Sequence, residues 1–368
     1  MNGRVRMAVA MKKGKPDRVP VMCQLSWGHV LINTGLRPFE FIFNPQAFAE
    51  GFWILRQKYH FDGILLDLGY HQSAEYRRKI RIEAVEGGDL CYLPDGGRLF
   101  CPNNDDPREY YDSKPLPPEI EDIDIKNIKM EGDVPEWKLE PYEIMIARAA
   151  GEFSVHGEIA SPFNGLIEIM GIQNAMMGLL LNPPKCLDLL WLFTERSWRM
   201  AKAQINLGID AIKISSPYAG KSFISKNMYR KFVLPCEGEL VKKIHEFKPG
   251  LPVYMHTCGA IGDRLELIAE DGVDGLECLD PPPLGDCDLA DAKKRIGGQM
   301  FIKGNMDSVN FLLNATPDTL DGYVKQQIAD GAPGGGYILS SACSVAPAVN
   351  PELLEALAPL VEKYGKYC

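Results

Sequence analysis

The stretch PVYMHTCGAIGDRLELIAEDGVDGLECL (residues 252–279) contains the pattern that decides the fold. A short apolar run at 252–257 is followed by a helix-like amphipathic segment at 261–270 and by a second apolar run at 275–279. Short apolar runs separated by a longer amphipathic segment are typical of parallel strands joined by a crossover helix. The stretch therefore predicts a strand, a helix and the next strand of a parallel sheet.

The same alternation continues on both sides of this stretch. Eight strands, most of them followed by a helix, favour a closed barrel over an open doubly wound sheet. The sequence thus predicts one (β/α)8 TIM barrel domain over residues 1–368. The expected strands are 18–24, 62–68, 153–159, 211–216, 252–257, 275–279, 300–305 and 336–341, and the expected helices include 185–207, 225–247, 261–270, 288–296, 317–330 and 351–364.

Residues 75–139 interrupt the alternation after the second expected strand. The run RRKIRIEAVEGGDLCYLPDGGRLFCP (77–102) alternates and contains two Gly-Gly turn signals, EGGD and DGGR. Such signals between alternating runs indicate antiparallel hairpins. We therefore expect a β-hairpin excursion, followed by a Pro-rich acidic loop, within the barrel.

Composition excludes some classes of function. Lys and Arg number 40 and Asp and Glu 49, so the net charge of −9 argues against a nucleic-acid-binding protein. The sequence has no 18-residue apolar stretch and no apolar core of a signal peptide near its first residues, which predicts a cytoplasmic protein that does not bind membranes. The 10 cysteines are then expected to be reduced, and some of them could be metal ligands.

His256 and Cys258 lie one residue apart at the end of the fifth expected strand, and Cys343 follows the eighth. Because the carboxyl ends of barrel strands meet at the active-site mouth, the three side chains are expected to converge. One imidazole and two thiolates suit Zn²⁺ and leave a fourth position open. Glu277 is the candidate for an exchangeable fourth ligand, with Asp280 as the alternative. Burial of His256 and the thiols in the core is the competing interpretation, and the other eight cysteines, Cys278 among them, lack comparable context.

Three further polar residues lie at expected strand ends. Asp67 ends the second strand, Asn305 ends the seventh, and His29 lies just beyond the first. We predict that all three line the substrate pocket and that Asp67 and Asn305 take part in catalysis. The competing interpretation is that they cap helices and turns, which Asn and Asp often do.

The whole chain resembles the uroporphyrinogen decarboxylase superfamily of (β/α)8 barrels. The similarity rests on KGKPDRVPVM (13–22), SPFNGLIEIMG (161–171), GIDAIKISSPYAGKSFISKNMYRKFVLP (208–235), VYMHTCG (253–259), GVDGLECLDPPP (272–283), FIKGNMD (301–307) and GGGYILSSACSVAPAVNPELLEAL (334–357).

Within that superfamily the H-x-C pair followed by a distant Cys resembles the zinc-dependent cobamide methyltransferases. This resemblance implies zinc bound by His256, Cys258 and Cys343. It also implies a partner protein that carries a corrinoid (cobalamin). A methyl group would move between the corrinoid and a thiol or folate, or from a methoxylated or methylated small molecule to the corrinoid.

Two alternatives remain open. The first is that the chain is a decarboxylase like others of the superfamily. Those enzymes bind substrate carboxylates with an Arg-rich segment, whereas this chain has MCQLSWGHVLINTG (22–35) at that place, without arginine. They also end the last strand with His where this chain has Cys343, although Asp67 falls near their essential aspartate. The second alternative is a non-catalytic protein that binds zinc or corrinoid, and a homodimer is left open in all cases.

Overall fold

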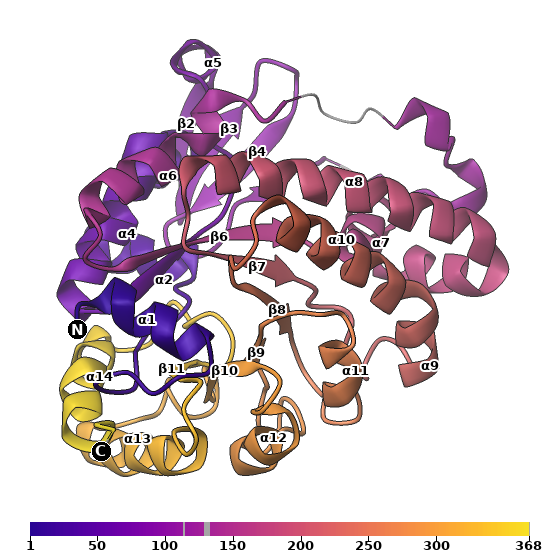
Figure 1. Ribbon diagram of the computed structural model, residues 1–368. Helices are drawn as coiled ribbons and strands as arrows, with labels where there is room; N and C mark the ends of the chain where they lie inside the picture. The colour runs from indigo at the N-terminus through magenta and orange to yellow at the C-terminus, as the bar shows by residue number, and fades with distance from the viewer. Residues whose placement is uncertain (113–114, 129–132, 368) are drawn as a thin grey trace.

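Seven parallel strands form a curled sheet in the order β1-β6-β7-β8-β9-β10-β11 (Figure 1). The structure is a computed structural model that describes residues 1–112, 115–128 and 133–367. Neighbouring strands are parallel throughout, so their carboxyl ends all lie at one end of the sheet. These strands are β1 (Gly63–Leu66), β6 (Ser154–Ala160), β7 (Ala211–Ser215), β8 (Val253–Thr257), β9 (Gly275–Cys278), β10 (Phe301–Met306) and β11 (Tyr337–Ser341).

The eighth position of the barrel is filled by residues 18–25, which run between β11 and β1. Val21 forms an isolated parallel bridge with Leu339, and its carbonyl accepts a hydrogen bond from the amide of Asp62 at 2.9 Å. Pro20 has no amide hydrogen to give to a neighbouring strand, which limits regular pairing here. The predicted first strand is thus an irregular segment that closes the ring. The predicted (β/α)8 barrel is confirmed.

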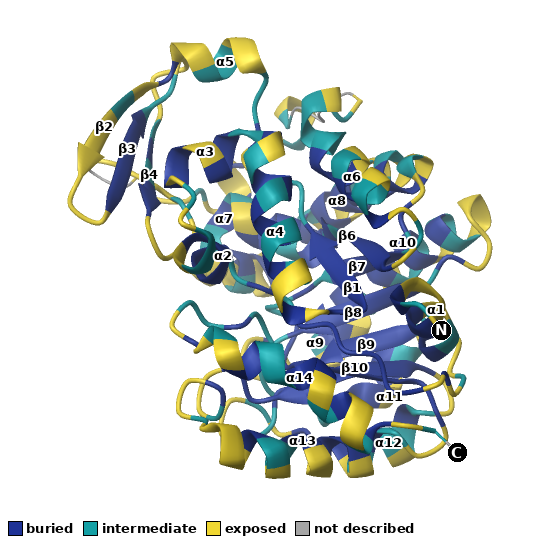
Figure 2. Ribbon diagram, turned by 90° about the vertical axis from the view of Figure 1, so that its left-hand side faces the viewer, coloured by how far each residue is buried: buried dark blue, intermediate teal, exposed yellow. Residues whose placement is uncertain are grey.

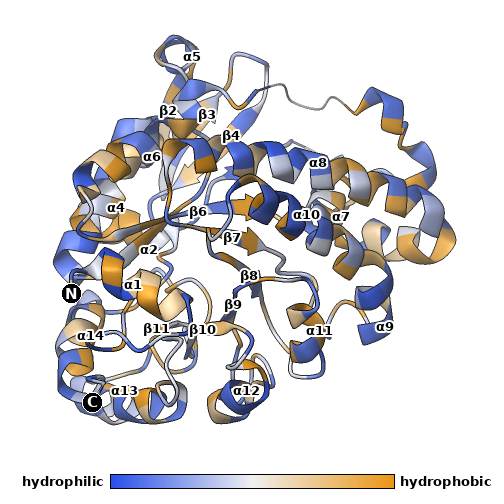
Figure 3. Ribbon diagram, viewed as in Figure 1, coloured by the Kyte–Doolittle hydropathy of each residue, from blue (hydrophilic) through white to orange (hydrophobic). Residues whose placement is uncertain are grey.

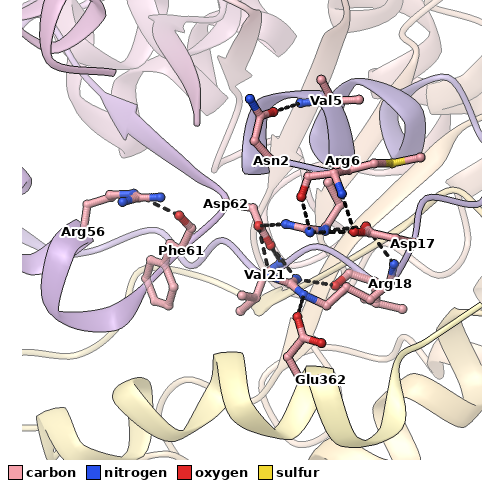
Figure 4. Close-up of polar contacts among 12 residues, drawn as sticks. Asn2, Val5, Arg6, Asp17, Arg18, Val21, Arg56, Phe61, Asp62 and Glu362 are labelled. Atoms are coloured by element: carbon pink, nitrogen blue, oxygen red, sulfur yellow. Dashed lines mark hydrogen bonds and ion pairs between the residues drawn. The ribbon is translucent and has the colours of Figure 1, made fainter. Parts of the chain in front are cut away.

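A buried carboxylate fastens this closing segment to the start of β1 (Figure 4). Asp62 accepts hydrogen bonds from the guanidinium of Arg18 and from the amide of Val21, both at 2.8 Å, and it also pairs with Arg6. The side chain of Asp62 is only 4% exposed. Charged groups at this depth are stable only when they are paired, so the three segments hold one another in place.

Helix α1 (Gly3–Met11) covers the amino-terminal end of the barrel. Its Met7 and Met11 are buried in one cluster with Tyr254 of β8 and Phe301 of β10, which lie near the starts of their strands. This end is therefore packed with apolar side chains. Any site inside the barrel has to open at the carboxyl ends of the strands.

Helices surround the sheet as an outer layer (Figure 1). Figure 2 shows the strands of the barrel as almost wholly buried, whereas the helices expose one face. Figure 3 shows polar and apolar residues alternating along α8 and α10. No helix in the described part of the chain combines the length and the apolar character needed to span a membrane. The helices are α2 (Trp27–Thr34), α3 (Pro38–Phe43), α4 (Pro45–Tyr59), α6 (Glu136–Ala149), α7 (Pro162–Leu181), α8 (Pro183–Leu207), α9 (Lys226–Met228), the π-helical turn η3 (Tyr229–Val233), α10 (Leu234–Phe247), α11 (Leu265–Ala269), α12 (Leu289–Ile296), α13 (Pro317–Gly331) and α14 (Pro351–Tyr364).

The excursion after β1 is a separate four-stranded antiparallel sheet that stands away from the barrel (Figure 2). The two Gly-Gly signals lie at its first two turns, where Gly87 and Gly96 have φ of +83° and +91°. The predicted hairpin is therefore present and is extended by two more strands. The segments of this region are α5 (Ala74–Lys79), β2 (Arg81–Val85), β3 (Gly88–Tyr92), β4 (Arg98–Pro102), β5 (Arg108–Glu109), η1 (Ile120–Asp122) and η2 (Ile125–Asn127).

Candidate metal centre

His256, Cys258 and Cys343 converge at the barrel mouth. His256 lies in β8, Cys258 directly follows that strand, and Cys343 lies two residues beyond β11. His256 Nε2 is 3.2 Å from Cys258 Sγ and 3.9 Å from Cys343 Sγ, and the two sulfur atoms are 3.8 Å apart. The structure thus brings together the three residues that the sequence placed on one rim.

These separations suit a tetrahedral metal ion. Zinc binds sulfur at about 2.3 Å and nitrogen at about 2.0–2.1 Å, so a tetrahedral site holds two sulfurs about 3.8 Å apart and a sulfur and a nitrogen about 3.5 Å apart. The observed separations of 3.2, 3.8 and 3.9 Å lie close to these values. The residues present therefore fit zinc in both donor type and spacing.

Glu277 of β9 lies behind the imidazole rather than beside the thiols. Its Oε2 is 2.9 Å from Nδ1 of His256, on the side of the ring opposite the sulfur atoms. A carboxylate in this position keeps the hydrogen on Nδ1 and leaves the lone pair of Nε2 free to bind a metal. Asp280, the alternative fourth ligand, accepts a hydrogen bond from the amide of Gly259 at 2.7 Å.

Two buried lysines keep Glu277 ionised. Lys303 of β10 donates to Glu277 and to Ser340, and Nζ of Lys213 lies 3.8 Å from Glu277 Oε2. Burial alone would raise the pKa of Glu277, but the charges of Lys303 and Lys213 outweigh burial and hold that pKa well below its usual range. Glu277 is therefore a permanent acceptor for His256.

The electrostatics of the centre favour the thiolate form of Cys343. Hydrogen bonding with Cys258 holds the pKa of Cys343 well below its usual range. Burial alone would lower the pKa of His256, but the electrostatic interaction with Cys258 raises it, and the net result is a raised pKa. Thiolate is the form of cysteine that binds metals, and a site that stabilises a cation beside thiolates also attracts a dication.

A pocket of about 370 Å³ opens beside the carboxyl ends of β1, β6 and β7. Trp27, Asp67, Tyr70 and Glu158 are among its lining residues. Asp67 accepts hydrogen bonds from the indole of Trp27 at 3.0 Å and from the amide of Gly69 at 3.1 Å. Burial, reinforced by the charge of Glu158, raises the pKa of Asp67 to about 7. Asp67 can therefore exchange a proton near neutral pH.

Lys213 of β7 connects the pocket to the candidate metal centre. Its Nζ is 2.9 Å from Oε2 of Glu158, which lines the pocket, and 3.8 Å from Oε2 of Glu277, which holds His256. It also donates to Gln24 at 2.8 Å. The two parts of the mouth thus share one buried set of ion pairs.

The other two predicted site residues, His29 and Asn305, are not among the residues that line this pocket. His29 does not join Asp67 at the pocket, because α2 turns it into the core, where its Nε2 is 2.8 Å from the hydroxyl of Tyr59 and it is fully buried. Asn305 lies near the mouth but uses its side-chain amide to hold the carbonyl of Leu279 at 2.9 Å. Its contact is with the loop after β9.

Sequence reasoning missed three residues of this centre. The sequence analysis does not predict Lys213 and Lys303, although a lysine inside an apolar strand indicates a buried partner of opposite charge. It also does not predict Cys278, whose sulfur lies within 4.8 Å of the Cys258 sulfur and of a ring nitrogen of His256.

The sequence model of the uroporphyrinogen decarboxylase (URO-D) family matches residues 112–364. A methylated-thiol–coenzyme M methyltransferase of Methanosarcina mazei is 27% identical over 198 residues, which make up 54% of this chain and 50% of that protein. A uroporphyrinogen decarboxylase of Legionella pneumophila is 30% identical over 165 residues, or 44% of each protein. The chain thus spans about half the length of the curated relatives it matches.

Solved structures share the fold over nearly the full chain. A methyltransferase from Methanosarcina mazei aligns with a TM-score of 0.74 and 18% identity and covers 99% of both chains. A B12-independent methionine synthase from Shewanella sp. W3-18-1, in complex with selenomethionine, aligns with a TM-score of 0.52 and 11% identity over 96% of this chain and 98% of that one. At these identities the likeness concerns the fold alone.

Proposed function

The chain belongs to the uroporphyrinogen decarboxylase (URO-D) family, and from that premise we propose that it is a zinc-dependent methyltransferase that works with a corrinoid protein. His256, Cys258 and Cys343 would hold the zinc. The methyl group would pass between the corrinoid and a small-molecule donor or acceptor at the barrel mouth. The similarity to the methyltransferase of Methanosarcina mazei supports this branch of the family.

One observation carries the proposal. A nitrogen and two sulfurs from the ends of β8 and β11 meet with separations of 3.2, 3.8 and 3.9 Å, which are close to those of a tetrahedral zinc site. Zinc bound by thiolates is suited to holding a substrate thiol or another weakly acidic group as a reactive anion. A decarboxylase that needs no metal has no use for such a set of donors.

The surrounding residues have separate tasks in this proposal. Glu277 orients the imidazole through Nδ1, and Lys213 and Lys303 keep Glu277 ionised. Direct ligation by Glu277, as the sequence suggested, would require its carboxylate to leave both His256 and Lys303. We therefore assign Glu277 to positioning.

Asp67 is the candidate proton carrier of the substrate pocket. Its carboxyl group, with a pKa of about 7, can give a proton to a leaving oxygen or nitrogen or take one from an attacking group. The pocket of about 370 Å³ suits a small molecule and contains the carboxylates of Asp67 and Glu158.

The alternative is a decarboxylase in which Asp67 stabilises a pyrrolic cation. Its position in the mouth pocket and the similarity to uroporphyrinogen decarboxylases favour this reading. Carbon dioxide release from uroporphyrinogen that persists in the presence of a zinc chelator would support it. Bound zinc with no methyl transfer to any thiol, folate or corrinoid acceptor would instead point to an accessory protein.

The first test is the zinc content of the purified protein. We expect about one zinc per chain in the wild type and little zinc in Cys258→Ser and Cys343→Ser. A tetrahedral site loses most of its affinity for zinc when one of its protein ligands is removed. Cys236→Ser, which changes a buried thiol of α10, is the matched control and should keep its zinc. A wild type without zinc, or Ser variants that retain it fully, would contradict the proposal.

A further inference from the structure

We propose that Cys278 is a fourth protein ligand of the metal centre, so that one imidazole and three thiolates surround the ion in the substrate-free protein. This inference rests on the zinc site proposed above and goes beyond its three ligands. It explains why a third thiol, that of the buried Cys278, lies at the same strand ends. The donor atoms of His256, Cys258 and Cys278 lie within 4.8 Å of one another.

The backbone of Cys278 is turned toward the centre. Side chains alternate along a strand, so Glu277, which faces His256, predicts that Cys278 points to the opposite side of the sheet. Cys278 instead has φ of +83° and the following Leu279 has φ of +53°, both in the left-handed region that non-glycine residues rarely adopt. This departure from strand geometry lets two consecutive residues face the same centre.

Neighbouring strands hold the turn in this conformation. The side-chain amide of Asn305 donates to the carbonyl of Leu279 at 2.9 Å. Gly304 of β10 approaches so closely that a Cβ there would lie 2.8 Å from the carbonyl oxygen of Cys278. Strained backbone persists only where the surroundings fix it, and such strain gathers at binding sites.

Packing alone does not account for this geometry. A cysteine that merely fills space behaves as a small apolar side chain and can do so from an ordinary strand conformation. Cys278 is fully buried, and its sulfur faces a thiol and an imidazole rather than an apolar cluster. Three sulfurs and a nitrogen form a donor set that zinc accepts in closed tetrahedral sites.

The deciding measurement is X-ray absorption at the zinc edge of the substrate-free wild-type protein, which counts sulfur neighbours. We expect three sulfurs and one nitrogen. Cys278→Ser should show two sulfurs and lose zinc to a competing chelator at least about tenfold more readily, since even residues that only orient ligands contribute that much. Cys287→Ser, a buried thiol in the loop after β9, is the matched control and should retain three sulfurs.

The outcomes separate this inference from the proposed function. Zinc with two sulfurs in the wild type would overturn the role of Cys278 and leave the site of His256, Cys258 and Cys343 intact. A wild type that binds no zinc would overturn both. Because the wild-type spectrum decides the matter, the result does not depend on the folding of the Ser variant.

Discussion

At the scale of single residues, the most consequential contact is the one between Glu277 and His256. Replacing Glu277 with Gln removes the charge that both orients the imidazole and neutralises Lys213 and Lys303, which are fully buried. Residues that orient a metal ligand in this way typically contribute about 10- to 100-fold in metal affinity. We therefore predict that Glu277→Gln binds zinc about 10- to 100-fold more weakly, as measured by competition with a chelator.

The control for this substitution is Glu266→Gln on α11, whose carboxylate pairs with Arg295 at the surface. That variant should bind zinc like the wild type. Unchanged zinc affinity in Glu277→Gln would show that the imidazole is held in place without its carboxylate partner.

The same residues show what sequence can reveal about a site. His256, Cys258 and Cys343 were identifiable because strand ends of a parallel barrel meet at one rim. Cys278 was not, because the argument from alternation assumes ordinary strand geometry and its φ is +83°. His29 was expected at the mouth, but α2 begins at Trp27 and carries it into the core. A periodic pattern of apolar residues along the sequence does not reveal such local departures from regular backbone geometry.

At the scale of elements, a buried cluster joins the helical layer to the sheet. Glu237 of α10 accepts a hydrogen bond from Ser216, which follows β7, and it also contacts the hydroxyl of Tyr229 in η3. That hydroxyl in turn lies 2.7 Å from Asp271, and Arg264 lies over the ring of Tyr229. The cluster ties the π-helical turn to the segments that follow β7 and α11.

This cluster predicts a pH-dependent stability. Burial raises the pKa of Glu237 from 4.5 to about 7 and also raises that of Asp271. A raised pKa means that the folded state binds the proton more tightly than the unfolded state does. The protonated carboxyl group of Glu237 therefore stabilises the fold fully below about pH 4.5, and this contribution is lost as the pH rises to about 7. At about 1.4 kcal/mol for each pKa unit, Glu237 accounts for a loss of about 3 kcal/mol in the free energy of unfolding.

The prediction is tested with Glu237→Gln, which keeps an acceptor for Ser216 but cannot ionise. Urea unfolding at pH 5 and pH 7.5 should show the variant gaining stability relative to the wild type as the pH rises. Comparing the two proteins at each pH cancels the pH dependence of metal binding, which they share. Glu246→Gln on the same helix, with an exposed side chain, is the control, and its free energy of unfolding should depend on pH as that of the wild type does. The same pH dependence in Glu237→Gln would refute the prediction.

The elements themselves were largely predictable. The helix expected at 351–364 is α14 (Pro351–Tyr364), and the strand expected at 211–216 is β7 (Ala211–Ser215), because periodicity and capping residues mark such boundaries. The segment expected at 18–24 is irregular because Pro20 cannot donate to a ladder and tertiary contacts fix it instead. The cluster at Glu237 joins distant segments, which no local pattern reveals.

At the scale of the whole molecule, the barrel separates a stabilising end from a functional end. The amino-terminal end is closed by α1 and by the contacts of Asp62 with Arg6 and Arg18, whose side chains are at most 9% exposed. The carboxyl ends of the strands carry the candidate metal centre and the pocket. Changes at the two ends should therefore affect different measurements.

Asp62→Asn provides the test of this separation. Removing the buried carboxylate leaves Arg6 with only Asp17 and Arg18 with only Glu362 as carboxylate partners, and both of these are more exposed than Asp62. The loss should therefore approach, without exceeding, the about 3–5 kcal/mol of the free energy of unfolding that an unpaired buried charge costs. Asp321→Asn, which breaks a surface pair with Lys363, should cost far less, because solvent screens an exposed ion pair. Urea unfolding of both variants measures the difference.

Zinc content is the second measurement, because it reports on the carboxyl ends of the strands at the other end of the barrel. Asp62→Asn should keep the wild-type zinc content while its unfolding midpoint falls, since Asp62 precedes β1 and the proposed ligands lie at and beyond the carboxyl ends of the strands. Cys258→Ser should show the opposite result. It should lose its zinc, and its free energy of unfolding should fall only by the contribution that zinc binding makes to stability. If Asp62→Asn also lost its zinc under folding conditions, the two ends would be coupled through the strands, and the closing segment at residues 18–25 would have to be counted as part of the site.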